Sequence, residues 1–495
     1  MPLKKFICGF LIAAAGLATP LYAEQPNIVL IYLDDFGWRD AGFMGSDFYE
    51  TPNLDALAHG GIIFDNAYSG AANCAPARAC LLSGQYTPRH KIFNVGTRPR
   101  GNRRHRRLEH IPGTNRLNPQ IKTWADQLGA AGYKMATIGK WHLSDDPLKS
   151  GFDFNVGGSH SGGPPRGYYP PHPNAPNLQD APKGEYLTDR LSSEACDFIR
   201  QNKDKPWMVY LTHFAVHTPI EGKTELLPKY RNKQPGELHD NVQMAAMIQA
   251  VDDGVGKIIK TLEELNLRNN TAIIIYSDNG GYGPATDMDP LKGYKGTYFE
   301  GGIRVPFAVN WPGHVAAGVT QSEPITGVDI YPTLCEIAGA RLPENQTMDG
   351  RSLVPLLKGE AKNFNRDGQP RPLFWHFPAY LQSFKGVYDE QPDPLFRSRP
   401  CSVIRQGDWK LILYFETGKV SLFNLRHDIG ETSDLAATQP EKANGLLKRL
   451  EQWQSSIDAP VPSKLNPEFD ESAEQAAIGA VSGKKKTRKD DKKTK

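Results

Sequence analysis

Short, uninterrupted runs of apolar residues recur along the chain, and segments with helical spacing separate most of them. Each run is five to seven residues long. Such runs are typical of strands that are buried on both faces of a parallel sheet. We predict five strands of this kind, over Asn27–Leu33, Lys134–Gly139, Trp207–Thr212, Thr271–Ser277 and Phe307–Trp311.

The intervening segments read as amphipathic helices. Thr51–Gly61 and Ile121–Tyr133 place apolar residues at helical spacing and contain a glycine stop, and Met244–Leu265 is the longest such pattern. Strands that alternate with helices predict an α/β fold, with a large, mostly parallel central sheet sandwiched by helices.

The pattern changes after about residue 360. Apolar stretches within residues 372–380, 401–415 and 419–436 alternate with turn residues, and a helical pattern follows over 440–457. We therefore predict a smaller C-terminal α+β domain with an antiparallel sheet. The expected organisation is an N-terminal α/β domain over 24–360, the smaller domain over 361–460, and a basic, disordered tail over 461–495.

The first 23 residues have the features of a secretory signal: a basic start, the apolar stretch "FICGFLIAAAGLA" and a small-residue end at Ala23. This apolar stretch is too short to cross a bilayer, and no later stretch approaches the roughly 20 apolar residues that a membrane helix needs. We expect a periplasmic or secreted protein without a membrane span.

Charge and cysteine content narrow the function. The net charge of +3 is too small to indicate a nucleic-acid partner, and nothing in the sequence indicates an oligomeric state. Five cysteines remain after the predicted signal. An odd number leaves at least one unpaired, so we expect core burial rather than a disulfide framework to stabilise the fold.

Polar, ionisable residues follow four of the predicted strands. Because ligands of open α/β sheets bind at the carboxyl ends of the strands, four such clusters predict one active site. Singly, an aspartate at such a position is more often a helix cap. The residues are Asp34 and Asp35, Lys140 and His142, His213 and His217, and Asp278 and Asn279.

Four of these residues, Asp34, Asp35, Asp278 and Asn279, offer only hard oxygen ligands. Oxygen-only sets suit Ca²⁺ or Mg²⁺ and fit Zn²⁺ poorly. The preponderance of carboxylates favours one Ca²⁺ per chain.

The stretch "ANCAPARAC" places Cys74 among small residues, followed by Pro76 and Arg78. One interpretation is a structural disulfide between Cys74 and Cys80. The other is a reactive residue at a helix start, where the positive end of the helix favours an anion.

The motifs "CAPAR", "GKWHL", "HTP", "SDNGG" and "GYKGTYFEGGIRVP" occur in one order. Together they resemble the formylglycine-dependent sulfatases of the alkaline-phosphatase superfamily, from about Asn27 to about Ala436. The family often has serine where this chain has Ala77.

The resemblance implies that a formylglycine-generating maturation enzyme converts Cys74 to formylglycine (3-oxoalanine), which also ligates the metal. A hydroxyl of the hydrated aldehyde, deprotonated with help from Asp278, attacks sulfur. His217 protonates the leaving oxygen, and His142 deprotonates the second hydroxyl to release sulfate. Arg78, Lys140 and Lys295 bind sulfate oxygens or orient the diol.

Several residues are candidates for contacts to a sulfated carbohydrate substrate. Ser159 matches a position that contacts sulfate in some family members, and His213 and His376 are further candidates. The segment "RPRGNRRHRRLEH" carries six arginines. We expect Arg103, Arg104, Arg106 and Arg107 to contact a polyanion, with a solvated loop as the alternative.

Two other functions remain open. The first is a phosphonate or phosphate ester hydrolase of the same superfamily; Lys140 and Lys295 argue against the two-zinc phosphatases, in which a second metal supplies that charge. The second is a binding module for sulfated glycans that has lost catalysis, although neither Cys74 nor the predicted metal ligands are missing.

Overall fold

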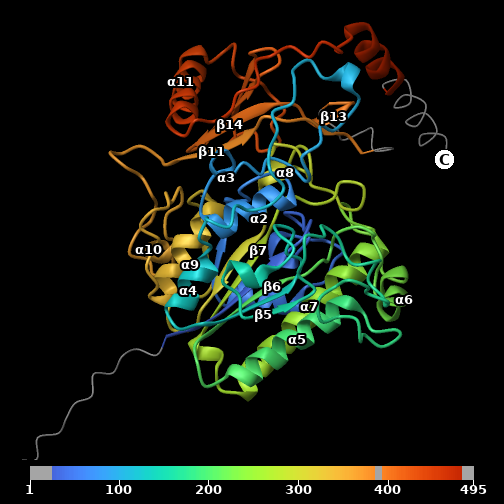
Figure 1. Ribbon diagram of the computed structural model, residues 1–495, viewed down its shortest axis with the longest axis vertical. Coiled ribbons are helices and arrows are strands. Elements are labelled where there is room, and N and C mark those ends of the chain that lie inside the picture. Colours follow the sequence, from blue (N-terminus) through green and yellow to red (C-terminus); the bar gives the residue numbers. More distant parts are fainter. Residues whose placement is uncertain (1–24, 385–392, 482–495) are drawn as a thin grey trace, which may run out of the picture.

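The computed structural model describes residues 25–384 and 393–481 (Figure 1). The predicted signal and the lysine-rich end at 483–495 lie outside the described residues. No helix within the described ranges is both long enough and apolar enough to cross a membrane.

The main sheet has eight strands in the order β5-β4-β6-β1-β7-β8-β2-β9. The five neighbouring strands β5, β4, β6, β1 and β7 are parallel to one another, which confirms the predicted fold class. All five predicted strands are present. For β8 the expected parallel pairing is wrong, because it pairs antiparallel with both β7 and β2. The strands are β1 (Asn27–Leu33), β2 (Ile62–Phe64), β4 (Lys134–Gly139), β5 (Phe154–Val156), β6 (Trp207–Thr212), β7 (Thr271–Ser277), β8 (Phe307–Asn310) and β9 (Val319–Gln321).

Helices cover both faces of this sheet. Along β1, Val29, Ile31 and Leu33 face one core and Ile28 and Leu30 face the other, so both faces of the strand are buried. Helices α5 and α7 pack together on the first face, whereas α4 and α9 lie on the second (Figure 1). The helices of this part are α1 (Pro52–His59), α2 (Cys74–Ser83), α3 (Thr87–His90), α4 (Trp124–Ala130), α5 (Leu187–Asn202), α6 (Leu227–Arg231), α7 (Val242–Glu264), α8 (Glu300–Ile303), α9 (Ile330–Ala338) and α10 (Val354–Leu357).

A four-stranded antiparallel sheet forms the C-terminal part, in the order β11-β14-β15-β16. Leu446 and Leu450 of α11 (Pro440–Ser456) cover one face of it. On the other face Trp375 packs on Tyr68 of the large part. The strands are β11 (Pro372–Phe377), β14 (Cys401–Gln406), β15 (Trp409–Tyr414) and β16 (Val420–Asn424), with two small pairs, β3 (Ala67–Tyr68) with β10 (Ile325–Thr326) and β12 (Leu381–Gln382) with β13 (Phe396–Ser398).

The chain from 461 to 481 differs from the expected disordered tail. Leu465 pairs with Leu108 through an isolated β-bridge, and residues 471–481 are helical. Acidic side chains of this stretch lie against the arginine-rich segment, and these contacts were not visible from the composition of the tail.

Candidate active site

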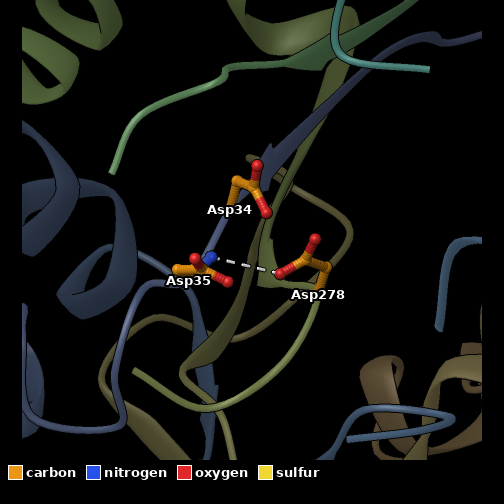
Figure 2. Close-up of side chains that lie close together, drawn as sticks. All are labelled: Asp34, Asp35 and Asp278. Carbon is orange, nitrogen blue, oxygen red and sulfur yellow. Dashed lines mark hydrogen bonds between the residues drawn. The ribbon is translucent and has the colours of Figure 1, made fainter. Parts of the chain in front are cut away.

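Three carboxylates meet at the carboxyl ends of two neighbouring strands (Figure 2). Asp34 and Asp35 follow β1 and Asp278 follows β7, and these strands are paired up to Leu33 and Ser277. One ligand oxygen of each aspartate lies within 4.8 Å of the others. The backbone N–H of Asp35 donates to Asp278 Oδ1 at 3.2 Å.

Two buried oxygens of this cluster are orphaned. Asp34 Oδ1 and Asn279 Oδ1 have no hydrogen-bond partner among the described residues. The Asn279 amide is oriented by its Nδ2, which donates to Asp35 Oδ1 at 2.9 Å. Because buried polar atoms are almost always satisfied, two orphaned oxygens beside three carboxylates fit a site for a hard cation such as Ca²⁺.

Three cationic side chains surround the carboxylates. Lys140 Nζ donates to Asp34 Oδ2 at 2.6 Å, and Lys295 Nζ donates to Asp35 Oδ2 at 2.7 Å. Arg78 Nη2 lies 3.0 Å from Asp278 Oδ2. Helix α2 therefore supplies the arginine, and the end of β4 and the loop before α8 supply the lysines.

The carboxylates differ in how easily they ionise. Burial raises the pKa of Asp35, but the charges of Lys295, His217 and Lys140 together outweigh burial and hold that pKa well below its usual range. Burial and the neighbouring charge of Asp34 raise the pKa of Asp278 to about 7. Three crowded carboxylates thus compete for the available positive charge, and a bound cation would relieve that competition.

Cys74 is the first residue of α2 and is buried. It lines a cavity of about 290 Å³ with side chains from distant parts of the chain. Among the residues predicted from the sequence, the cavity brings together Cys74, His142, His217 and Lys295. The other lining residues are Asn73, Val95, Arg100, Gly162, Thr218, Tyr282, Leu381, Phe384 and Arg397.

Both cavity histidines are held in the neutral form. Burial lowers the pKa of His217 to about 3, with a further contribution from the charge of Lys295, and burial lowers that of His142 in the same direction. His217 Nδ1 lies 2.8 Å from the Thr218 carbonyl. Since a carbonyl only accepts, Nδ1 carries the hydrogen and Nε2 is left for proton transfer.

His142 has a constrained backbone. Its φ of +68° lies in the left-handed region that non-glycine residues seldom adopt. A Cβ on Gly162 would lie 2.6 Å from the imidazole ring, so only glycine leaves room for it. This local strain indicates that the position of the His142 ring is important for the function of the site.

The other predicted substrate contacts do not line this cavity. His213 is buried without a hydrogen-bond partner among the described residues, and the Ser159 carbonyl accepts from the His142 N–H at 2.9 Å. His376 lies within the C-terminal part, where its ring nitrogens are 2.6 Å from Ser402 Oγ and 3.1 Å from the Pro460 carbonyl.

The arginines of the segment 98–110 fall into two groups, those that form ion pairs with described residues and those that do not. Arg103, Arg104 and Arg107 form ion pairs with Glu468, Asp470 and Glu471 at 2.6, 2.5 and 3.4 Å. Arg106 makes no ion pair with a described residue, and its Nε and Nη1 are buried without partners in the described chain. Arg100, outside the group predicted to contact substrate, lies in the cavity.

The sequence did not predict the part of the cavity wall whose residues lie far from Cys74 along the chain. Leu381, Phe384 and Arg397 come from the C-terminal part. Arg397 lies about 300 residues from Cys74 in the chain, and no local pattern sets it apart from its neighbour Arg399. The density of arginines in the segment 98–110 indicated an anion-binding region, but spacing alone did not show that Arg100 is the arginine that lines the cavity.

All five described cysteines are free and buried. Cys80 Sγ lies 3.3 Å from His90 Nε2, and His90 Nδ1 accepts from the Ile92 N–H. The alternative of a Cys74–Cys80 disulfide is therefore absent from the described structure.

An alkaline-phosphatase-like α/β enzyme is the class that this sheet and the carboxylate site define. The sulfatase family model matches residues 26–340, and a model for the C-terminal region of N-sulphoglucosamine sulphohydrolase matches residues 294–456. The chain belongs to the formylglycine-dependent sulfatase family and is a sulfuric ester hydrolase.

Individual relatives are similar over nearly the whole chain. A sulfatase of Formosa agariphila is 32% identical over 88% of this chain and 90% of its own. Human N-acetylgalactosamine-6-sulfatase is 31% identical over 91% and 89%. The crystal structure of Ps i-CgsB in complex with k-i-k-neocarrahexaose is 31% identical, with a TM-score of 0.71 over 93% of this chain and 98% of that one.

Proposed function

We propose that this protein is an exported sulfatase that hydrolyses sulfate monoesters of sulfated carbohydrates, with a formylglycine made from Cys74 and one Ca²⁺. The observation that carries the proposal is the position of Cys74, at the start of α2 and in one cavity with His142, His217 and Lys295. The relative named for N-acetylgalactosamine 6-sulfate and the neighbour bound to neocarrahexaose support a sugar substrate.

Asp34, Asp35, Asp278 and Asn279, together with residue 74, would hold the Ca²⁺. The ion would supply positive charge that offsets the carboxylates and stabilises the oxygens of the sulfate group. Lys140 and Arg78 hold Asp34 and Asp278 in place through the contacts at 2.6 and 3.0 Å, so the ligand oxygens are ordered before any ion arrives. Lys295 reaches the cavity, where it is positioned to contact a sulfate oxygen.

Side chains around residue 74 would carry out each proton transfer of the reaction. One hydroxyl of the hydrated aldehyde gives its proton to Asp278 and attacks sulfur, while His217 gives a proton to the departing sugar oxygen. His142 then takes the proton of the second hydroxyl as the bond between the first oxygen and the residue 74 carbon breaks, which releases sulfate and restores the aldehyde. An anionic sulfate ester in the cavity favours the charged imidazole of His217 and opposes its lowered pKa.

The maturation enzyme is the proposed protein partner, because a cysteine cannot become an aldehyde without an external oxidant. It would act on the "CAPAR" segment before folding, since Cys74 is only 2% exposed in the folded chain.

The test is a comparison of kcat/KM on an aryl sulfate and on the matched aryl phosphonate, followed by a panel of defined sulfated oligosaccharides. The proposal predicts a large preference for the sulfate and desulfation of at least one oligosaccharide. A preference for the phosphonate, or two Zn²⁺ per active chain, would contradict it.

A further inference from the structure

Arg397 is a buried cation in the cavity, and it forms no ion pair with an acidic side chain of the described residues. Its side chain and backbone are together 8% exposed, so water offers its charge little solvation. By contrast, the similarly buried Arg78, Arg304 and Arg371 have a carboxylate oxygen at 3.0, 3.4 and 2.7 Å. Arg397 therefore differs from these buried arginines in what balances its charge.

Neutral contacts hold the Arg397 guanidinium in place. Its Nε donates to the Gln382 carbonyl at 3.0 Å and its Nη1 donates to the Lys295 carbonyl at 3.2 Å. The guanidinium carbon lies 3.7 Å from the centre of the Phe384 ring. The group is thus fixed beside Lys295 by carbonyls and an aromatic face, none of which carries a negative charge.

Arg100 is a second cation on the same cavity wall. Its Nη2 donates to the Val95 carbonyl at 2.9 Å, and it makes no ion pair within the described ranges. The next residue, Gly101, donates its N–H to Gln382 Oε1 at 3.0 Å. Gln382 thus accepts hydrogen bonds both from the Arg397 side chain and from the backbone next to Arg100.

Like charges gathered in a small, partly enclosed space are costly. Burial lowers the pKa of Arg397 to about 10, and the charge of Arg100 acts in the same direction. Lys295, the other cation of this wall, already pairs with Asp35. A cavity that keeps two arginines without carboxylates has the electrostatics of an anion-binding site.

We propose that Arg100 and Arg397 form a second anion subsite, beside the site for the scissile sulfate, for a further sulfate ester or carboxylate on the substrate. The inference rests on the proposed function. The cavity volume of about 290 Å³ is at the low end for ligand pockets, so the second anionic group lies on the same sugar ring or on the adjoining one. Arginine suits both groups because its planar donors bind two oxygens at once.

The experiment measures binding by calorimetry to the Cys74→Ala protein, which prevents turnover. The probes are N-acetylgalactosamine 6-sulfate, its 4,6-disulfate, and a disaccharide in which glucuronate adjoins N-acetylgalactosamine 6-sulfate. We expect at least one doubly charged probe to bind about 10-fold or more tightly than the monosulfate, as charge-assisted hydrogen bonds commonly give. Preference for the disulfate assigns a sulfate subsite, and preference for the disaccharide assigns a carboxylate subsite.

Variants localise the effect. Arg100→Gln and Arg397→Gln should each reduce the preference toward one, and Arg397→Lys should retain part of it. Arg98→Gln is the matched control, since Arg98 is exposed two residues from Arg100. Arg100 holds only the Val95 carbonyl, so its variant remains informative if Arg397→Gln misfolds.

Equal binding of all three probes, or a preference that survives both substitutions, would overturn the subsite. Failure of the proposed function has a different signature: an aryl sulfate that is not hydrolysed by the parent protein carrying formylglycine.

Discussion

Lys140 and Asp34 form an ion pair in the interior, with Lys140 Nζ 2.6 Å from Asp34 Oδ2 and neither side chain exposed. Lys140 follows β4 and Asp34 follows β1, and β6 lies between these strands. The contact therefore requires three strands to run parallel and end at the same edge. A charge in this position is tolerated only with its partner, which ties the stability of the sheet to the charges of the site.

Replacing Lys140 with methionine should destabilise the protein strongly. Lys140→Met keeps the bulk of the side chain but leaves Asp34 buried without its lysine, and breaking such a pair costs about 3–5 kcal/mol. The measurement is urea unfolding in the presence of a chelator. Lys149→Met, at an exposed lysine, should change the free energy of unfolding by less than about 0.5 kcal/mol. Equal effects of the two variants would contradict the buried pair.

Removing one carboxylate should weaken metal binding. Asp278→Asn takes away one of three negative charges whose ligand oxygens lie within 4.8 Å, and we expect the affinity for Ca²⁺ to fall by about 10-fold or more. Calorimetric titration of the chelator-treated protein with Ca²⁺ gives the affinity directly. Asp289→Asn is the control, because Asp289 is exposed. Unchanged affinity in Asp278→Asn would exclude Asp278 as a ligand.

The central sheet could be predicted from the sequence because its strands are buried on both faces. An uninterrupted apolar run such as Thr271–Ser277 has few alternatives, and the polar residue after it marks the strand end. The direction of β8 could not be read in this way, since parallel and antiparallel strands of a buried sheet carry the same apolar pattern.

The site was predictable at the strand ends and in the family motifs that contain Cys74 and Lys295. Asp34, His142 and Asp278 were found because strand ends converge in this fold. Arg397 comes from β13 in the C-terminal part, and its place beside Lys295 depends on how the two parts pack. The acidic partners of Arg103 and Arg104, which are Glu468 and Asp470, were also hidden, because they lie more than 360 residues further along the chain.

His376 should make the protein sensitive to acid. Burial lowers its pKa to about 4, whereas the hydrogen bond to the Pro460 carbonyl acts in the opposite direction. The unfolded chain binds a proton near pH 6.5 and the folded chain does not, so this contribution is complete above about pH 6.5 and is lost as the pH falls toward 4.

The test compares the free energy of unfolding at pH 7 and pH 5. In His376→Gln the loss between these values should be smaller than in the parent protein by about 2 kcal/mol. His59→Gln, at an exposed histidine, should leave the loss unchanged. The assignment fails if His376→Gln and the parent protein lose stability equally.

The chemical state of residue 74 in active protein tests the proposed function most directly. Preparations made with different amounts of the maturation enzyme are digested, and mass spectrometry gives the fraction in which residue 74 has exchanged sulfur and two hydrogens for one oxygen. We predict that kcat on an aryl sulfate rises in proportion to this fraction and extrapolates to zero where Cys74 is unmodified. Full activity with an intact Cys74 thiol, or with Cys74 joined to Cys80, would contradict the proposal that formylglycine at position 74 is the nucleophile.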